Sequence, residues 1–397
     1  MLRVLRLLTG GESHGQALVG ILDGMPAGLA VSASEIDLQL RRRQAGHGRG
    51  GRMKIERDQV QILSGVRHGL TLGSPIALQI SNRDWPNWTD RMGVEPSERP
   101  TEPVTRLRPG HADLPGALKY GQQDVRNVLE RASARETAMR VALGAVARRL
   151  LARFGIELRS ETVAIGEVAT EPAEWVATDR RGAWGKRAER YWEEVETSPV
   201  RCGDPNAADG MIRAIDVARQ AGDTLGGVFL VVAYGVPAGL GSHVQWDRKL
   251  NGRLAGALMS VNSIKGVEVG VGFGGAPLPG SSYHDVIDRD PERGWLRKSN
   301  RAGGIEGGMS NGEPILLRCA AKPIPTLMKP LPSVDLVTKE PVAAGIERSD
   351  VCVVPAAGVV GEAMVALVLA DAFLEKFGGD SVEEIERNYR GYLQTIG

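Results

Sequence analysis

The most regular helical pattern in the chain constrains what can be built around it. From Met139 to Leu151 apolar residues recur at helical spacing, and Phe154-Gly155 ends the segment. The stretch Arg131–Thr137 (RASARET) precedes it, and within that stretch Ser133 and Glu136 have the S-x-x-E spacing of a capping box. We therefore predict a central helix with its N-cap at Ser133.

The start of this helix suits an anion. Its first N–H groups have no partner within the helix, and the helix dipole favours negative charge there. Arg131 and Arg135 flank that end and add two forked cationic donors, a combination that suits a phosphate. The alternative is a capped surface helix with solvated arginines, and this stretch alone favours that alternative.

Composition narrows the class of protein. Of the 397 residues, 42% are hydrophobic and 24% charged, as in a soluble globular protein, and the net charge of +1 argues against nucleic-acid binding by bulk charge. The cysteines, Cys202, Cys319 and Cys352, are far apart and predict neither a disulfide framework nor a metal site. We read no signal peptide and expect no apolar run that approaches the ~20 residues needed to span a bilayer. We expect a cytoplasmic protein that binds no membrane.

Strand-like and helical stretches alternate along the chain. We expect strands at 4–8, 18–22, 156–168, 226–236, 266–273 and 315–321. We expect further helices at 207–221, 247–260, 359–377 and 382–393, and a short one opened by a capping box at Ser34–Asp37. Residues 53–80 suggest antiparallel hairpins, 82–109 a long functional or mobile loop, and 171–199 an excursion of unknown role.

Two nearly identical hexapeptides, Gly24–Leu29 (GMPAGL) and Gly235–Leu240 (GVPAGL), each follow a predicted strand and precede a predicted helix. The shared context favours two related β-turn-α units, an internal pseudo-repeat within one fold. No shift of composition divides the chain, so we predict a single domain over residues 1–397. Antiparallel strands mixed with long helices indicate the α+β class.

Gly11–Gly15 (GESHG) matches G-x-S-x-G, the nucleophile elbow of α/β-hydrolases. A hydrolase built on Ser13 is therefore a rival hypothesis, and a third is a non-catalytic anion-binding protein. Against the elbow, the motif lies near the start of the chain, whereas an elbow follows a central strand of a parallel sheet. A tight glycine turn with a hydrogen-bonded His14 explains the motif equally well.

Histidine and arginine recur beside turn glycines. His111 lies in Arg108–Asp113 (RPGHAD), and histidine can give and take a proton near neutral pH. Seven arginines stand in glycine-rich surroundings: Arg43, Arg49, Arg52, Arg108, Arg131, Arg135 and Arg348. If they converge, they form a pocket for a polyanion; the alternative is a set of scattered, solvated arginines.

A stiff segment, Lys322–Thr326 (KPIPT), ends a predicted strand with a cation and a hydroxyl. The chain contains neither a G-x-x-x-x-G-K-[ST] loop nor a G-x-G-x-x-G loop in a strand-to-helix context. A P-loop and a Rossmann site are therefore disfavoured.

Together these stretches resemble the chorismate synthase family, in family order and over essentially the whole chain. The matching motifs are Gly10–Gly15, Gly48–Glu56, Arg108–Asp113, Arg131–Ala138, Gly222–Gly227, Gly303–Gly312, Lys322–Thr326 and Arg348–Val351. The chain has Ala132 where the family commonly has a serine, so a contact there would come from the backbone.

The resemblance implies a lyase of the shikimate pathway. It would convert 5-enolpyruvylshikimate 3-phosphate to chorismate by 1,4-anti elimination, with reduced FMN required although the reaction has no net redox change. The implied fold is a β-α-β sandwich with helices packed between antiparallel sheets, assembled as a homotetramer. Some members reduce their flavin with NADPH, and whether this chain does so is left open.

The resemblance also implies roles for individual residues. His14 would protonate the departing phosphate, His111 would hold a proton beside the flavin, and Asp350 would take the proton that the flavin removes from the substrate. FMN would be bound by Arg131, Ala132, Ser133, Asn262, Ser263, Gly307, Lys322, Pro323, Ile324, Pro325, Thr326 and Arg348. Arg43 and Arg49 match the pyridine-nucleotide positions, and the substrate would be bound by Ser13, Arg49, Arg52, Arg108 and Arg135.

Overall fold

The structure is a computed structural model. It describes residues 2–50, 57–97, 101–178, 185–291, 294–347 and 349–396. Arg52 and Arg348, both predicted for the site, lie outside these ranges.

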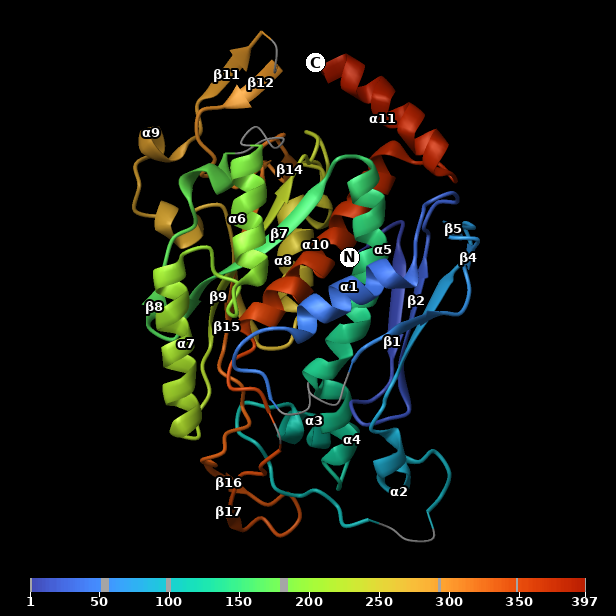
Figure 1. The fold of residues 1–397 in the computed structure, drawn as a ribbon, viewed down its shortest axis with the longest axis vertical. Coiled ribbons are helices and arrows are strands. Elements are labelled where there is room, and N and C mark those ends of the chain that lie inside the picture. Colours follow the sequence, from blue (N-terminus) through green and yellow to red (C-terminus); the bar gives the residue numbers. More distant parts are fainter. Residues whose placement is uncertain are drawn as a thin grey trace.

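A four-stranded antiparallel sheet in the order β1-β2-β6-β3 is formed by the first part of the chain (Figure 1). Its strands are β1 (Arg6–Gly10), β2 (Ala17–Asp23), β6 (Ile76–Ser81) and β3 (Val60–Ile62). Along β2, Leu18 and Leu22 are buried while Val19 and Ile21 are exposed, so one face of the sheet packs on the core and the other is open. The strands predicted at 4–8 and 18–22 are confirmed, the first with a displacement of two residues.

A five-stranded antiparallel sheet has the order β10-β15-β9-β7-β8. Its strands are β10 (Ile264–Val269), β15 (Ile315–Ala321), β9 (Gly227–Tyr234), β7 (Glu157–Ile165) and β8 (Val168–Ala169). Residues of β9 are buried on both faces, Phe229 and Val231 on one and Leu230 and Val232 on the other. A central strand covered on both sides has a continuous apolar sequence, as the strand predicted at 226–236 does.

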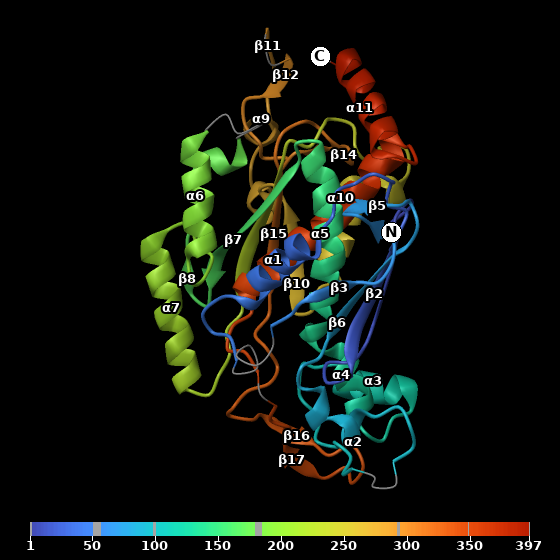
Figure 2. The ribbon, with the colours of Figure 1, turned by 45° about the vertical axis from the view of Figure 1, so that its right-hand side comes forward.

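Helices pack between the two sheets (Figure 2). Helix α5 (Thr137–Arg153) lies on the four-stranded sheet and α10 (Val354–Phe377) on the five-stranded one, and the two helices pack against each other. Their contact needs small residues, because a Cβ added at Gly144 would lie 2.5 Å from the Cβ of Ala363. The predicted α+β class is confirmed.

Helix α1 (Ala33–Gln44) lies across α5 and α10, and α8 (Leu250–Met259) packs on α10. The predicted capping box at Ser34 is wrong, because Ser32 is the N-cap. Its Oγ accepts a hydrogen bond from the amide of Glu35, and the Glu35 carboxylate accepts one from the Ser32 amide. Ser32 has a glutamate three residues later, which reaches back better than the aspartate in the same relation to Ser34.

The excursion at 171–199 covers the outer face of the five-stranded sheet. Its helix α6 (Lys186–Thr197) and the preceding turn η4 (Glu174–Ala177) bury Trp192 and Trp175 against that face. The role that the sequence left open is therefore a second hydrophobic layer.

Helix α10 is long and apolar enough to cross a bilayer. The expectation that the chain contains no such segment is therefore wrong. The whole of that apolar stretch is buried inside the protein, which is typical of a core helix.

The two hexapeptides form turns with the same hydrogen bonds. At Gly24–Leu29, the Thr71 hydroxyl donates to the carbonyl of Pro26 at 2.6 Å and accepts from the last amide of the hexapeptide at 2.9 Å. At Gly235–Leu240, Ser310 does the same at 2.6 Å and 2.8 Å. Each hydroxyl comes from a two-stranded hairpin, β4 (Val66–Arg67) with β5 (Leu70–Thr71), and β13 (Ile305–Glu306) with β14 (Met309–Ser310).

The loop predicted at 82–109 contains two short helices, η2 (Trp85–Asn87) and α2 (Thr89–Met92). The remaining elements are α3 (Asp113–Tyr120), α4 (Arg126–Ala132), η3 (Ala134–Glu136), α7 (Pro205–Gln220), η5 (Trp246–Arg248), η6 (Gly272–Gly275), α9 (Gly280–Tyr283), β11 (Ile287–Asp290), β12 (Gly294–Arg297), β16 (Pro332–Val334), β17 (Pro341–Ala343) and α11 (Val382–Ile396).

Candidate active site

The turn between α4 and α5 is the point around which the predicted site residues assemble. Ser133 caps the turn η3, since its Oγ accepts a hydrogen bond from the amide of Arg135 at 3.3 Å. The predicted capping box is wrong, because Glu136 pairs with Arg140 one turn later, with Oε1 and Nε 2.9 Å apart. The α-helix therefore begins at Thr137, later than predicted, and the amides before it belong to a 3-10 turn.

Both arginines of this turn bind protein groups. Arg131 donates to the carbonyls of Gly11 at 3.1 Å and Thr9 at 2.9 Å. Arg135 Nη1 lies 2.5 Å from Asp58 Oδ1, and both side chains are buried. The two arginines therefore also brace the turn against β1 and the segment at Asp58, and the anion site at this turn stays a prediction.

His14 is held by a buried carboxylate. Its Nδ1 lies 2.9 Å and 3.0 Å from the two oxygens of Glu130, and its amide donates to Glu130 Oε2 at 2.8 Å. Burial raises the pKa of the Glu130 carboxyl, but hydrogen bonds from His14 and the charges of His14 and Arg126 outweigh burial, so this pKa lies below its ordinary value. The carboxylate thus occupies Nδ1, and Nε2 has no partner among the residues that the structure describes.

Ser13 connects His14 to the central turn. Its amide donates to the carbonyl of Glu130 at 3.0 Å, and its hydroxyl accepts a hydrogen bond from Ser133 at 3.2 Å. The residue is 4% exposed. Both the histidine and the serine of the glycine turn are therefore fixed on the last residues of α4.

His111 has the same kind of partner. Its Nδ1 lies 2.5 Å from Asp113 Oδ1, and Arg108 donates to Asp113 Oδ2 at 2.8 Å. Burial alone would raise the pKa of Asp113, but hydrogen bonds from His111 and Arg108 hold this pKa at about 2. The carboxylate is charged at neutral pH, and Nε2 of His111 is again without a partner in the described part of the chain.

The predicted segment Lys322–Thr326 lies beside His111. Arg108 Nη1 donates to Thr326 Oγ1 at 3.3 Å, and Lys322 Nζ donates to the carbonyl of Gly110 at 2.6 Å. Pro323 and Pro325 keep this segment extended. Ile324 accepts a hydrogen bond from Thr224, which fixes the middle of the segment.

A second pair of contacts joins this segment to the central turn. The amide of Lys322 donates to the carbonyl of Ser263 at 2.9 Å, and Asn262 Nδ2 donates to the carbonyl of Ala132 at 3.0 Å. Ser263 has φ +73°, a conformation that non-glycine residues seldom adopt and that often marks a ligand site. The Oδ1 of Asn262 is buried and has no hydrogen-bond partner in the described ranges.

Three arginines and two aspartates form a charged cluster below the turn. Arg43 donates to Thr137 Oγ1 and to the carbonyl of Ala134, both at 2.9 Å, and its buried Nη1 has no hydrogen-bond partner among the described residues. Burial lowers the pKa of Arg43 to about 10; the Asp58 carboxylate opposes this, and the charges of Arg49 and Arg135 add to it. A guanidinium next to two others is a site that favours an anion.

Asp350 lies at the edge of this cluster. Its Oδ2 is 2.7 Å from Arg49 Nη1, and its Oδ1 accepts a hydrogen bond from the amide of Gly50. The sequence placed this carboxylate beside Arg348, which is outside the described residues. The structure shows that Arg49 is a partner of Asp350.

Gly307 lies apart from the other predicted residues. The hairpin that carries it contacts the first residue of α8, because the amide of Leu250 donates to the carbonyl of Gly308. Asn262 follows the other end of that ten-residue helix, which spans roughly 15 Å. Gly307 and Asn262 therefore do not meet within one chain.

Four functional candidates were not selected from the sequence: Asp58, Trp88, Asp113 and Glu130. Asp113 belonged to a quoted motif, and Glu130 directly precedes another. Asp58 and Trp88 carry no local signal, since each acts through a contact with a residue more than 70 positions away.

A hydrolase elbow at Ser13 is not what the structure shows. Both large sheets are antiparallel, whereas the elbow belongs to a parallel sheet. The nearest histidine, His14, is paired with Glu130, and the Ser13 hydroxyl is bonded to Ser133. The alternative of a hydrogen-bonded glycine turn is the correct interpretation of GESHG.

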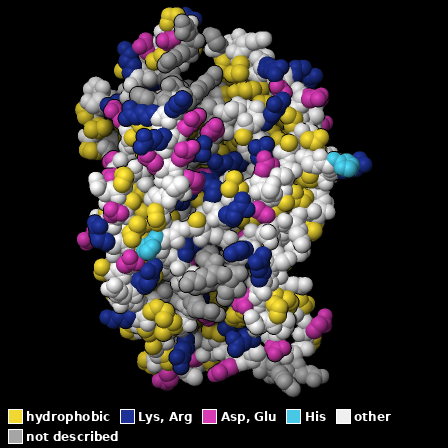
Figure 3. All heavy atoms as spheres, viewed as in Figure 1, with side chains coloured by type: hydrophobic (Ala, Val, Ile, Leu, Met, Phe, Trp, Pro, Cys, Tyr) yellow, Lys and Arg dark blue, Asp and Glu magenta, His cyan; other side chains and the backbone are white. Residues whose placement is uncertain are grey.

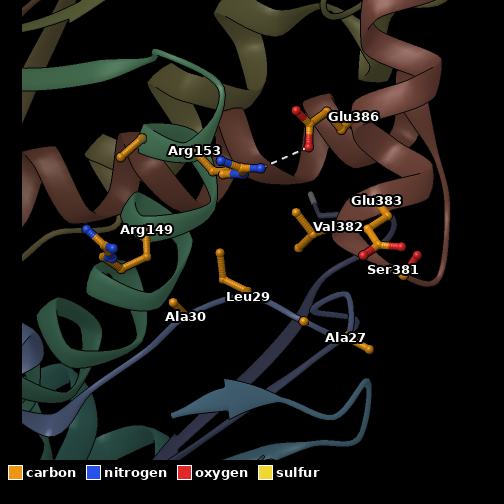
Figure 4. Close-up of a pocket in the computed structure, with 11 residues that line it drawn as sticks. Ala27, Leu29, Ala30, Arg149, Arg153, Ser381, Val382, Glu383 and Glu386 are labelled. Carbon is orange, nitrogen blue, oxygen red and sulfur yellow. Dashed lines mark hydrogen bonds and ion pairs between the residues drawn. The ribbon is translucent and has the colours of Figure 1, made fainter.

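The hollow in Figure 4 is separate from these residues. It has a volume of about 620 Å³ and lies at the C-terminal end of α5, between the loop at Ala27–Ala30 and the start of α11. Arg153 and Glu386 form an ion pair across it, at 2.9 Å. The predicted site lies at the other end of α5, roughly 25 Å away.

Comparisons with known proteins agree with one another. The model of a family described as chorismate synthase matches residues 5–374. Chorismate synthases of Moorella thermoacetica and Pelobacter propionicus are 59% and 58% identical to this chain; each alignment covers 99% of this chain and 100% and 99% of the relative. A solved structure described as a crystal structure of chorismate synthase has a TM-score of 0.80 and 44% identity, and the match covers 100% of this chain and 99% of that one.

Proposed function

The chain belongs to the chorismate synthase family and converts 5-enolpyruvylshikimate 3-phosphate to chorismate, and we propose that it does so by a 1,4-anti elimination that depends on reduced FMN. The reaction belongs to the shikimate pathway of aromatic amino-acid biosynthesis. The substrate carries a phosphate and two carboxylates, which suits a site rich in arginine.

One observation supports this proposal most strongly. Both histidines are tied to the dipeptide Ala132-Ser133 by hydrogen bonds, His14 through Ser13 and His111 through the segments at 322–326 and 262–263. Each has its Nδ1 on a buried carboxylate, which leaves Nε2 for exchange of a proton. Two oriented imidazoles around one turn can each give or take a proton, which fits the loss of a phosphate and a ring hydrogen from one substrate.

We assign FMN to the residues along this line of contacts. They are Arg131, Ala132, Ser133, Asn262, Ser263, Lys322, Pro323, Ile324, Pro325 and Thr326; Arg348, which the resemblance also implies, lies outside the described residues. The residues fit the group: the orphaned buried oxygen of Asn262 suits an N–H donor of the flavin ring, and Lys322 and Thr326 suit its phosphate. When bound, reduced FMN supplies electron density to the substrate as the phosphate leaves.

The remaining roles are assigned as follows. Ser13, Arg49, Arg52, Arg108 and Arg135 bind the substrate anions, and Arg43 and Arg49 also hold NADPH if the enzyme reduces its own flavin. His14 protonates the departing phosphate, His111 holds a proton beside the flavin, and Asp350 receives the proton that the ring carbon of the substrate loses. The contact between Asp350 and Arg49 would hold this carboxylate in place.

The assembly is proposed to be a cytoplasmic homotetramer without nucleic-acid or membrane partners. Charges of both signs are interspersed on the face shown in Figure 3, which fits the absence of a nucleic-acid partner. In a tetramer, Gly307, which does not reach Asn262 of its own chain, would serve the site of a neighbouring copy.

We also infer that the fold is an internal repeat in one domain. The sheet orders β1-β2-β6-β3 and β7-β9-β15-β10 correspond strand for strand, and each second strand is followed by one of the two hexapeptide turns. The matching hydrogen bonds of Thr71 and Ser310 support this inference.

An anaerobic assay with reduced FMN and 5-enolpyruvylshikimate 3-phosphate tests the proposed reaction, with formation of the diene followed by ultraviolet absorbance. We expect product with reduced FMN and none with oxidised FMN. His14→Ala should slow the reaction by ~10²–10⁴-fold, as for loss of a general acid, while FMN binding is little changed. Equal turnover with and without reduced flavin would contradict the proposal.

A further inference from the structure

We propose that Trp88 and Glu130 are positioning residues for His14. Trp88 holds one face of its imidazole and Glu130 holds one edge, so that Nε2 alone is presented for proton transfer. The inference rests on the proposed function for its chemical meaning. Its structural content, an imidazole held in one orientation, can be tested without substrate or flavin.

The edge of the ring is fixed by Glu130. Both oxygens of this carboxylate lie within 3.0 Å of Nδ1, and the same carboxylate accepts a hydrogen bond from the amide of His14. The Glu130 side chain is 1% exposed, and its pKa is held below the ordinary range. A charged carboxylate requires a proton on Nδ1, so the ring cannot rotate to exchange its two nitrogens without losing this bond.

The face of the ring is covered by Trp88. The two ring centroids are 3.8 Å apart and the planes are inclined by 26°. The indole is itself fixed, because its Nε1 donates to Asp84 at 2.9 Å, and Asp84 accepts a second hydrogen bond from Asn87 at 2.8 Å. The segment between β6 and α3, which the sequence predicted only as a long loop, thus delivers one aromatic ring to His14.

Arg126 closes these contacts into a ring of four residues. Its guanidinium lies 5.4 Å from the centroid of the Trp88 indole and donates to Glu130 at 3.0 Å. The cycle therefore runs from His14 to Trp88, Arg126, Glu130 and back. Each member restrains two others, which is more than an isolated stacking contact would do.

Charged groups lie on several of the elements around His14. The charged groups around His14 are Glu130 and Arg126 on α4, Asp84 and Arg91 on the segment that carries Trp88, Glu12 on its own turn, and Glu347, 4.0 Å from Arg126. A ring held in one orientation among these groups keeps Nε2 in one place, which proton transfer to a departing phosphate needs.

A structural role alone would make Trp88 an anchor for its loop. The two interpretations differ in what they predict for protonation. An anchor affects stability, whereas a positioning residue also changes the pH at which His14 titrates and the pH profile of the reaction.

Fluorescence of the full-length chain without substrate or flavin tests the geometry. A protonated imidazole in contact with an indole quenches its emission, so the emission of wild type minus that of Trp88→Phe should follow a sigmoid in pH. His14→Gln should abolish the sigmoid, and Glu130→Gln should move its midpoint to lower pH, because the imidazole loses its charged partner. Trp295→Phe, which removes an exposed tryptophan, is the matched control and should leave the sigmoid in place.

Kinetics then connect the geometry to the reaction. Glu130→Gln should lower kcat by about tenfold or more with little change in KM, shift the alkaline limb of the profile to lower pH, and be partly rescued in Glu130→Asp. Trp88→Leu should lower kcat more than Trp88→Phe. A pH-independent difference emission, or a sigmoid that survives in His14→Gln, overturns the inference even if the enzyme is active. If wild type forms no product while the sigmoid is present, the proposed function fails and the geometry stands.

Discussion

Arg135 and Asp58 form a buried ion pair 77 residues apart in the sequence, with Nη1 2.5 Å from Oδ1. The other oxygen of Asp58 lies 3.8 Å from Arg43 Nη1. One carboxylate thus stands between two guanidiniums and attaches the segment before β3 to the turn that opens α5.

Removal of one partner of this pair should be costly. We expect Asp58→Leu to destabilise the fold by about 3–5 kcal/mol, because it removes the carboxylate between two buried guanidiniums, and Arg135→Leu to cost less, because Arg43 still lies beside Asp58. The double variant should lose less than the sum of the two. Urea unfolding of the three variants and the wild type gives the coupling energy, and strictly additive losses would contradict a direct pair.

Arg49→Ala should weaken the substrate more than the flavin. The variant removes a charge-assisted contact worth ~1.5–3 kcal/mol. Its loss of substrate affinity relative to wild type should shrink as salt rises, because screening also weakens the wild-type attraction. Steady-state KM and flavin titration at low and high salt measure both ligands. Arg67→Ala, an exposed arginine on β4, is the control. An equal loss for both ligands would mean that Arg49 supports the fold instead.

Asp350→Asn preserves shape and can still accept the hydrogen bond from Gly50, but the amide cannot act as a base. We expect folding and ligand binding to persist while turnover falls strongly. Deuterium at the departing ring position should then give a larger isotope effect than in wild type. Asp247→Asn, which breaks an exposed ion pair with Arg3, should change neither quantity. Loss of turnover that only follows loss of thermal stability would reduce Asp350 to a partner of Arg49.

Gly144→Ala should destabilise the protein through the contact of α5 with α10. The new Cβ would lie 2.8 Å from the Cα of Ala363, so backbone must move, at a cost of about 1–3 kcal/mol. Gly391→Ala in α11 is the matched control. A Cβ there meets nothing within 4 Å, so the better helix propensity of alanine should stabilise the helix by roughly 0.5–1 kcal/mol. Thermal unfolding compares the two, and similar shifts would contradict the packing argument.

Glu161 should make stability depend on pH. It is buried on β7, where the hydroxyl of Tyr191 donates to it at 2.6 Å, and burial raises its pKa from 4.5 to about 7 although Tyr191 and other donors oppose the rise. Because the folded value is raised, this contribution to stability is fully present below pH 4.5 and is lost as pH rises to about 7. The loss is on the order of 3 kcal/mol.

The variant Glu161→Gln should remove this dependence, since the amide stays neutral and can still accept the bond from Tyr191. The difference in melting temperature between variant and wild type should therefore shift in favour of the variant between pH 5 and pH 8. Asp113, whose pKa is lowered to about 2, is present in both proteins, so its contribution to the pH dependence cancels in the difference of melting temperatures. A pH-independent difference would contradict a protonated Glu161.

Local sequence determined the secondary structure and the family of this protein. The helices of α5, α8 and α11 follow from apolar periodicity, and β9 follows from a continuous apolar run, because these patterns record which faces an element must bury. The motifs, in family order, are sufficient to indicate the chorismate synthase family. Two predictions about helix ends were wrong: the N-cap of α1 is Ser32 and not Ser34, and the residues predicted as the first turn of α5 form a 3-10 turn.

The partners of the site residues were decided by the tertiary structure. Glu130 meets His14 across 116 residues, and Asp58 meets Arg135 across 77, because packing of the first sheet and α1 against α5 brings their turns together. A pattern in the sequence shows that a histidine or an arginine is available, but the pairing depends on distances that exist only after the sheets and helices have closed around their core. That is why the sequence indicated His14 and Arg135, and only the fold could show Glu130, Trp88 and Asp58 beside them.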